Sequence, residues 1–316
     1  MHETGSEGRY VGRNAVLLLI FNRPETTRQV FQAIREARPP RLYVASDGPR
    51  PEKQDEARVV QGLREQVLAA VDWPCEVRTL FRDENLGCKW APCGAIDWFF
   101  EQEEQGIILE DDCLPSPTFF RFCDELLEKY ASDPTVGGVT GDLLSLSSPH
   151  PPDTYGRVIY SLTWGWASWR RVWKLYDPYL KAWDGDIRKI ERLANKPWAT
   201  RDYLRRVLDA VQNGELPTAW DFQFTFTCLR HKMDFLHPQV NMITNIGFAP
   251  GATHTHDPED PKAALPRHDV RFPLKGLVKD DAYERWLDRN VFARPPLITR
   301  AFNRLQRSLR KLKRTT

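Results

Sequence analysis

The sequence predicts an α/β protein with a mixed, mostly parallel sheet flanked by helices. Short apolar runs of strand length alternate with longer helical patterns over residues 15–140, which is typical of a parallel sheet. Three consecutive acidic residues, at 110–112, also follow directly after the apolar run at 106–109. Ligands bind beyond the carboxyl ends of the strands in such sheets, so these residues are candidates for a functional site.

The individual elements follow from local patterns. A strand is expected at 15–21, and a helix running to about residue 36 then opens at 22–25, with Pro24 in its first turn. In 56–71, apolar residues recur every four positions, which predicts a helix. Further strands are expected at 41–46, 75–81, 106–109, 136–140 and 233–236, further helices at 91–105, 118–130 and 203–213, and a turn at 85–87.

Three consecutive carboxylates, Glu110, Asp111 and Asp112, directly follow the fourth expected strand. Adjacent carboxylates repel one another, so a partly buried set favours a bound cation, and hard oxygen ligands suit Mg²⁺ or Mn²⁺. The alternative is that these acids favour the N-terminus of the next helix. Because Ser116 and Pro117 already supply a capping residue and a first-turn proline there, we expect metal or substrate binding.

Composition limits the classes of function. The chain has 316 residues, 41% of them hydrophobic, and a formal net charge of +2, which argues against general electrostatic binding of nucleic acid. Its six cysteines form no CxxC pair, which favours reduced thiols in a cytoplasmic protein. The apolar run at 15–21 is too short to span a membrane, and no secretory signal is recognised.

Tryptophans concentrate in the middle of the chain, where Trp164, Trp166, Trp169 and Trp173 lie within ten residues. Aromatic side chains fill protein cores, and their faces also stack on the apolar faces of sugar rings. The sequence leaves both roles open for this cluster.

Three polar residues later in the chain, an aspartate and two histidines, each have two possible roles. Asp221, next to Trp220, precedes the apolar segment 222–229, so it is either a helix N-cap or a functional acid. His254 and His256 are separated by one residue. That spacing suits a metal site on a strand, whereas exposed loop histidines are the simpler alternative.

The C-terminal segment 297–316 is predicted to be a basic amphipathic helix. Its apolar residues recur at spacings of four, three, four and three, and seven basic residues lie between and just after them. Such a helix suits an anionic membrane surface through 297–314, or a partner groove. Docking on its own domain is the alternative.

Residues 109–120, Leu-Glu-Asp-Asp-Cys-Leu-Pro-Ser-Pro-Thr-Phe-Phe, resemble the metal-site segment of GT-A glycosyltransferases. The resemblance is to the N-acetylglucosaminyltransferase I type and to related bacterial sugar-nucleotide transferases that act in the cytosol. It extends over about residues 14–256. Four further segments agree in order: 21–24 with the first nucleotide loop, 46–48 with the loop that contacts the base, 164–166 with the acceptor loop, and 220–221 with the segment that holds the catalytic base.

The resemblance implies a Rossmann-like nucleotide-diphospho-sugar transferase, metal-dependent and inverting, with a UDP-linked donor and a glycan or lipid-linked glycan acceptor. It implies a role for each matching residue. These roles are metal ligation by Asp112, with His254 as a further candidate; donor binding by Arg23, Asp47, Glu110 and Asp111; proton removal from the acceptor by Asp221; and acceptor binding by Trp164, Trp166 and Trp220.

The same resemblance divides the chain. The catalytic domain is expected at 14–256, with a nucleotide-sugar half at 14–112 and an acceptor half at 113–256, followed by an extension at 257–296 and the basic helix at 297–316. The family's Golgi members carry a membrane anchor that is not recognised here. They also carry a second acid where this chain has Phe222. We therefore expect a cytoplasmic enzyme, peripheral at the inner face of the membrane.

Two other classes of protein share some of these features. A sugar-nucleotide pyrophosphorylase has a similar α/β architecture, but it needs a glycine- and basic-rich loop after its first strand, and 21–24 is not one. A non-catalytic carbohydrate-binding module would keep the tryptophans but would need no carboxylate triplet. Nucleotide release measured with and without Mn²⁺ separates the three.

Overall fold

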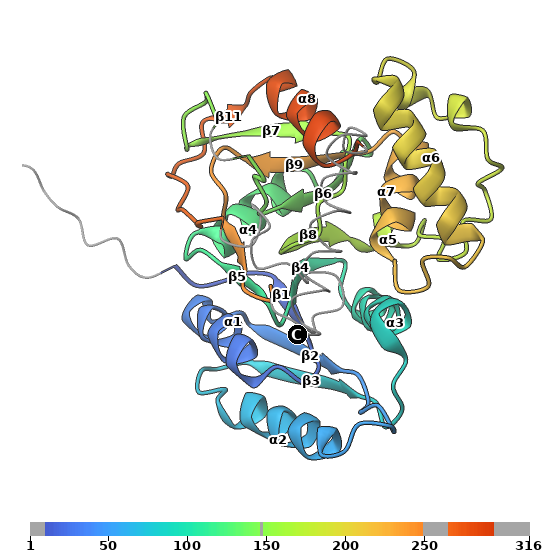
Figure 1. The fold of residues 1–316 in the computed structure, drawn as a ribbon. Helices are drawn as coiled ribbons and strands as arrows, with labels where there is room; N and C mark the ends of the chain where they lie inside the picture. Colours follow the sequence, from blue (N-terminus) through green and yellow to red (C-terminus); the bar gives the residue numbers. More distant parts are fainter. Residues whose placement is uncertain (1–9, 146–147, 249–264, 294–316) are drawn as a thin grey trace, which may run out of the picture.

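The computed structural model describes residues 10–145, 148–248 and 265–293 (Figure 1). His254, His256 and the predicted helix at 297–316 lie outside the described residues. All six cysteines are free thiols. No helix in the described part of the chain is long and apolar enough to cross a membrane.

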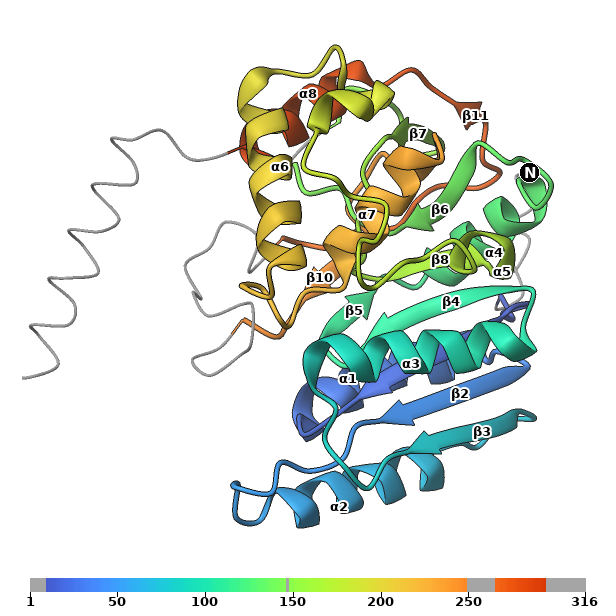
Figure 2. The ribbon, with the colours of Figure 1, turned by 90° about the vertical axis from the view of Figure 1, so that its right-hand side faces the viewer.

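The first part of the chain forms a regular parallel unit. Strands β1, β2, β3 and β4 lie side by side in the order β4-β1-β2-β3, and all their pairings are parallel. Figure 2 shows α3 lying along these strands. The elements are β1 (Ala15–Ile20), α1 (Pro24–Ala37), β2 (Arg41–Ser46), α2 (Glu56–Ala69), β3 (Glu76–Phe81), α3 (Gly87–Gln102) and β4 (Gln105–Glu110).

The second part extends the same sheet with mixed directions, in the full order β11-β7-β9-β6-β8-β4-β1-β2-β3. Strand β8 runs antiparallel to both β4 and β6, and β7 runs antiparallel to β9. The elements are β5 (Cys113–Pro115), α4 (Phe119–Lys129), β6 (Val136–Thr140), β7 (Thr154–Val158), β8 (Trp166–Trp169), α5 (Arg170–Trp173), η1 (Ile187–Lys189), η2 (Glu191–Leu193), α6 (Trp198–Gln212), α7 (Asp221–Arg230), β9 (Asp234–Pro238), β10 (Ile243–Asn245), β11 (Gly276–Leu277) and α8 (Asp281–Asn290).

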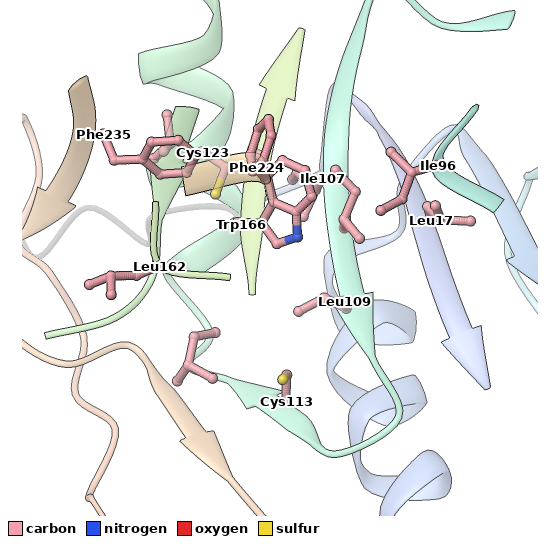
Figure 3. Packing of buried hydrophobic residues seen from close by; sticks show 14 of the residues in the cluster. Leu17, Ile96, Ile107, Leu109, Cys113, Cys123, Leu162, Trp166, Phe224 and Phe235 are labelled. Atoms are coloured by element: carbon pink, nitrogen blue, oxygen red, sulfur yellow. The ribbon is translucent and has the colours of Figure 1, made fainter. Parts of the chain in front are cut away.

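The core lies on both faces of the sheet. Trp166 and Trp169 are three residues apart on β8, so they point to opposite faces. Trp166 packs on Phe224 of α7 with ring centroids 5.1 Å apart (Figure 3), whereas Trp169 Nε1 donates to the Leu127 carbonyl of α4 at 3.2 Å. Helices α4 and α7 therefore cover opposite faces.

This is the α/β sheet with flanking helices that the sequence predicts. The strands expected at 15–21, 41–46, 75–81, 106–109, 136–140 and 233–236 are present within a residue or two of the expected bounds. Residues 276–290, from the predicted extension, add β11 beside β7 and helix α8. The predicted domain boundaries stay a prediction.

Three expectations about local structure were wrong. Helix α6 begins at Trp198, five residues before the expected start at 203. Helix α3 begins at Gly87, not at residue 91, because Asp47 accepts hydrogen bonds from the Leu86 and Gly87 amides at its N-terminus. Ser116 does not cap α4. The N-cap position belongs to Thr118, and Ser116 directly follows β5, which pairs with β10. The corrections at α3 and at Ser116 come from contacts with residues distant in the sequence.

Candidate functional site

The predicted donor-binding residues gather at one edge of the sheet. Arg23 lies after β1, Asp47 after β2, and Glu110 ends β4. Because these three strands are parallel neighbours, their carboxyl ends meet at the same edge. Asp111 and Asp112 continue from β4 into the turn before β5. Arg23 and Asp112, which are 89 positions apart in the sequence, come into direct contact there.

Arg23 binds the acid triplet directly. Its Nη1 atom lies 2.5 Å from Asp112 Oδ2 and 3.5 Å from Asp111 Oδ1. The Asp111 carboxylate also accepts a hydrogen bond from the Phe21 amide at 3.2 Å. The loop after β1 and the turn after β4 are therefore held together by charge-assisted contacts, which are the stronger kind of hydrogen bond.

The acids have unusual electrostatics. Burial, followed by the charges of Asp112 and Asp111, raises the pKa of Glu110 above the usual range of a carboxyl, and Asp221 adds to this shift. Burial and the charge of Asp112 likewise raise the pKa of Asp111. Arg23 lowers both pKa values but does not offset the other causes. With Arg23 as the neighbouring cation, full ionisation of the triplet is therefore unfavourable, and a further bound cation would favour the ionised carboxylates.

The loop after β1 is held in place by residues outside the predicted site, and sequence reasoning missed these residues. Asn22 Nδ2 donates to Glu56 Oε1 at 2.8 Å, and Arg50 contacts the same carboxylate through its backbone amide at 2.8 Å and through its guanidinium. Hydrogen bonds from Arg50 lower the pKa of the buried Glu56 to about 2. The Arg50 guanidinium also lies 5.4 Å from the Phe21 ring centroid. These contacts hold Arg23 in place, and no local motif at 50–56 signals them.

The Asp47 carboxylate makes hydrogen bonds within the protein. Its carboxylate accepts hydrogen bonds from the backbone amides of Gly48, Leu86 and Gly87 at 2.9–3.1 Å. A side chain at Gly48 would overlap the backbone of Glu84. Asp47 therefore joins the loops after β2 and β3. Its contact with a nucleotide stays a prediction.

Asp221 comes to the triplet from the other half of the chain. It is the first residue of α7, and Trp220 holds the N-cap position, so the N-cap alternative does not apply. Its charge helps to raise the pKa of Glu110, which places the two carboxylates within electrostatic reach of each other. The first turn of α7 therefore brings a further carboxylate to the region of the acid triplet. Its catalytic role stays a prediction.

The segment after β10 packs closely on Asp112. The Ile246 amide donates to the Asp112 carbonyl at 2.8 Å, and a side chain at Gly247 would overlap the Asp112 carboxylate. Phe248 follows, and its ring meets Trp164 edge-on with centroids 5.9 Å apart. The partly buried Trp164 therefore lies near the triplet through Phe248, which keeps it a candidate for acceptor contact.

The other two predicted acceptor residues belong to the core in this structure. Trp166 is 1% exposed and Trp220 is 7% exposed, and their ring centroids are 6.1 Å apart. Core filling, one of the two roles that the sequence leaves open for the tryptophan cluster, accounts for Trp166, and Trp220 packs in the same core. Their contact with an acceptor stays a prediction, and Trp164 is the better-placed candidate.

Asp142 is a further buried acid near the site. It lies two residues beyond β6, and its Oδ2 accepts a hydrogen bond from the Trp164 amide at 3.2 Å. Its Oδ1 atom has no hydrogen-bond partner among the residues that the structure describes, and burial raises the pKa of the carboxyl well above the usual value. The strand expected at 136–140 could have identified Asp142, because the rule about strand ends applies to it too.

The residues present fit a divalent cation only in part. Within the described ranges, no three His, Cys, Asp or Glu side chains converge as a ready ligand set. Magnesium sites at nucleotides, however, are commonly built from one or two carboxylates and the phosphates of the substrate. Asp112, a carboxylate oxygen donor beside two further acids, suits that type of site. His254 lies outside the described residues.

Comparisons with known proteins add little. No protein-family model and no curated protein matches the chain. Among solved structures, the crystal structure of HddC from Yersinia pseudotuberculosis is 13% identical, with a TM-score of 0.28, over 40% of this chain and 58% of that chain. A similarity at this level assigns neither family nor function.

Proposed function

We propose that the chain is a GT-A type glycosyltransferase, metal-dependent and inverting, that moves a sugar from a nucleotide-diphosphate sugar to a hydroxyl of a glycan or lipid-linked glycan. The observation that carries the proposal is the meeting of two halves. Arg23 and the acid triplet lie at the carboxyl edge of the parallel strands, and Asp221 of α7 lies close enough for its charge to act on Glu110. Such an edge is where ligands bind in open α/β sheets.

The donor half of the site would bind the nucleotide diphosphate. Arg23 offers a guanidinium that can pair with phosphate oxygens. Asp112 would hold Mn²⁺ or Mg²⁺ together with the phosphates. A bound cation would supply charge neutralisation for the departing diphosphate. Glu110 and Asp111 would face the ribose and the transferred sugar, and Asp47 would keep the loops after β2 and β3 in position.

The acceptor half would supply the proton acceptor. In the proposed reaction, the Asp221 carboxylate takes the proton of an acceptor hydroxyl, and the oxygen forms a bond to the anomeric carbon. The bond from that carbon to the diphosphate oxygen breaks on the opposite face, and the nucleoside diphosphate leaves with the electron pair. The anomeric configuration is thereby inverted.

Nucleotide release from a panel of UDP-, GDP- and dTDP-sugars tests the proposal. We expect release from one donor class with Mn²⁺ and its loss with excess EDTA. Asp112→Asn, which removes one charge and keeps the shape, should lose Mn²⁺-dependent donor binding in calorimetry. Asp83→Asn is the matched control, an exposed acid after β3 at the same edge. Equal donor affinity of Asp112→Asn and the wild type would refute the metal assignment.

Two further parts of the proposal rest on sequence. Residues 297–314 would bind an anionic membrane surface, placing the enzyme near a lipid-linked acceptor. The full chain should then bind anionic vesicles in low salt and release them as salt rises, whereas a chain ending at Pro296 should not bind. If both chains float equally with vesicles, the membrane proposal fails. The role of His254 as a metal ligand also stays a proposal.

A further inference from the structure

Two aromatic side chains stand apart from the core. Trp90 on α3 is 40% exposed, and Tyr179, in the segment after α5, is 58% exposed. Their ring centroids lie 5.4 Å apart, with an angle of 46° between the planes. Lys89 Nζ lies 4.8 Å from the Trp90 centroid and 5.9 Å from that of Tyr179. We call Trp90, Tyr179 and Lys89 the aromatic shelf.

The shelf is held in a defined geometry. Lys89 Nζ donates to the Pro178 carbonyl at 2.8 Å, so the ammonium joins α3 to the segment that carries Tyr179. A second ammonium, that of Lys181, lies 5.6 Å from the Tyr179 ring centroid. Rigid aromatic side chains lose little conformational entropy when they bind, which suits a recognition surface.

The shelf lies beside the candidate site. On one side, α3 begins at Gly87, whose amide donates to Asp47 at the edge of the sheet. On the other side, the Tyr176 hydroxyl donates to the Trp220 carbonyl at 3.2 Å, directly before Asp221. The charge of Asp221 helps to raise the pKa of Tyr176, so Asp221 lies close to this segment. The shelf residues thus follow, within three positions in the chain, residues that contact Asp47 and the backbone directly before Asp221.

We propose that the aromatic shelf binds the sugar ring that follows the reactive sugar in the acceptor. This inference rests on the proposed glycosyltransferase function and names an acceptor of at least two linked rings. Aromatic faces stack on the apolar faces of sugars, and the two ammonium groups can donate to hydroxyl or carboxylate oxygens. A protein partner fits less well, because specific protein interfaces bury about 1,600 Å², far more than two side chains offer.

The test compares p-nitrophenyl and methyl glycosides of the same sugar as acceptors for the full chain. The nitrophenyl ring takes the place of the second sugar. We expect the wild type to have a KM about 3- to 10-fold lower for the aryl glycoside, the range of aromatic pair energies. In Trp90→Ala and in Tyr179→Ala the two KM values should become equal. If no transfer is detected, saturation-transfer NMR compares the binding of the same glycosides.

Trp198→Ala is the matched control, because Trp198 is 71% exposed at the start of α6. It should keep the aryl preference. A wild type without the preference, or shelf variants that retain it, would overturn the shelf proposal. Nucleotide release into water, measured in the wild type without acceptor, reports on the proposed function separately. If no donor releases its nucleotide, the glycosyltransferase proposal fails, whatever the glycosides show.

Discussion

The two halves of the sheet differ in strand direction and in where their charged and aromatic side chains lie. The half from β1 to β4 is regular and parallel, and its strand ends carry charged side chains that contact one another. The half from β5 to α8 is mixed in direction, and its tryptophans mostly lie in the core. Regular strand ends can position a compact charged group such as a diphosphate. Irregular segments over an aromatic core can position an acid and rings for a larger, more variable ligand.

The largest effect should come from the core of the second half. Trp166→Ala should lower the free energy of unfolding by about 3–5 kcal/mol, the usual cost of truncating a buried aromatic, because Trp166 packs on Phe224, Trp173 and Trp220. Urea denaturation of the variant and the wild type measures it. Trp164→Ala, at a partly buried position, should cost less. Equal losses for the two variants would remove the distinction between core and site tryptophans.

The next effect connects the two halves through Asp221. Asp221→Asn should leave calorimetric donor binding intact and lower kcat of transfer by about 10²-fold or more, the scale of general base catalysis. Asp281→Asn, which changes another aspartate at the first position of a helix, should leave kcat unchanged. Transfer by Asp221→Asn at the wild-type rate would mean that another group accepts the proton.

A smaller effect is expected in the first half, at the contact that fixes the loop after β1. Glu56→Gln should raise the donor Kd about tenfold, because it weakens the charged hydrogen bonds from Arg50 and loosens the attachment of Asn22. Glu25→Gln on α1 is the control, since its pair with Arg28 is largely exposed and such pairs contribute little. Equal donor Kd values for both variants would show that Glu56 does not position the loop.

The smallest effect concerns Asp142 and depends on pH. Because its pKa is raised in the folded chain, the unfolded chain gives up this proton at lower pH, and folding becomes less favourable as pH rises from about 3.9. Asp142→Asn has no such proton and can still accept from the Trp164 amide. Its Tm should exceed that of the wild type by about 2 °C or more at pH 7.5, since 1 kcal/mol shifts Tm by roughly 2 °C in a chain of this length.

The Asp142 comparison carries its own control, because at pH 4 the two Tm values should nearly coincide. A lower Tm for Asp142→Asn at pH 7.5 would mean that the carboxylate is charged and stabilising. In that case the second half would contain a charged ligand site of its own, and the contrast between the halves would weaken.

The first half of the molecule could largely be predicted from the sequence. Apolar runs and helical periods locate β1 to β4, and acids at a strand end point to the cluster with Arg23. The partners of these residues could not be predicted, because Glu56 and Asp47 act through contacts with distant loops. In the second half, the sequence around β8 shows only a cluster of tryptophans. The tertiary packing is needed to show that Trp166 belongs to the core, whereas Trp164 lies beside Phe248.

The order of strands in the sheet has a consequence for biosynthesis. Strand β4 ends at Glu110, whereas its neighbour β8 ends only at Trp169. Strand β6 lies between β8 and β9, and β9 ends at Pro238. Because chains emerge from the ribosome N-terminus first, β4 keeps an open edge until β8 has been made, and β6 keeps one until β9 follows. Open edges are templates for pairing with other chains. A polypeptide released between residues 110 and 166 is therefore expected to aggregate, even though its first four strands are complete.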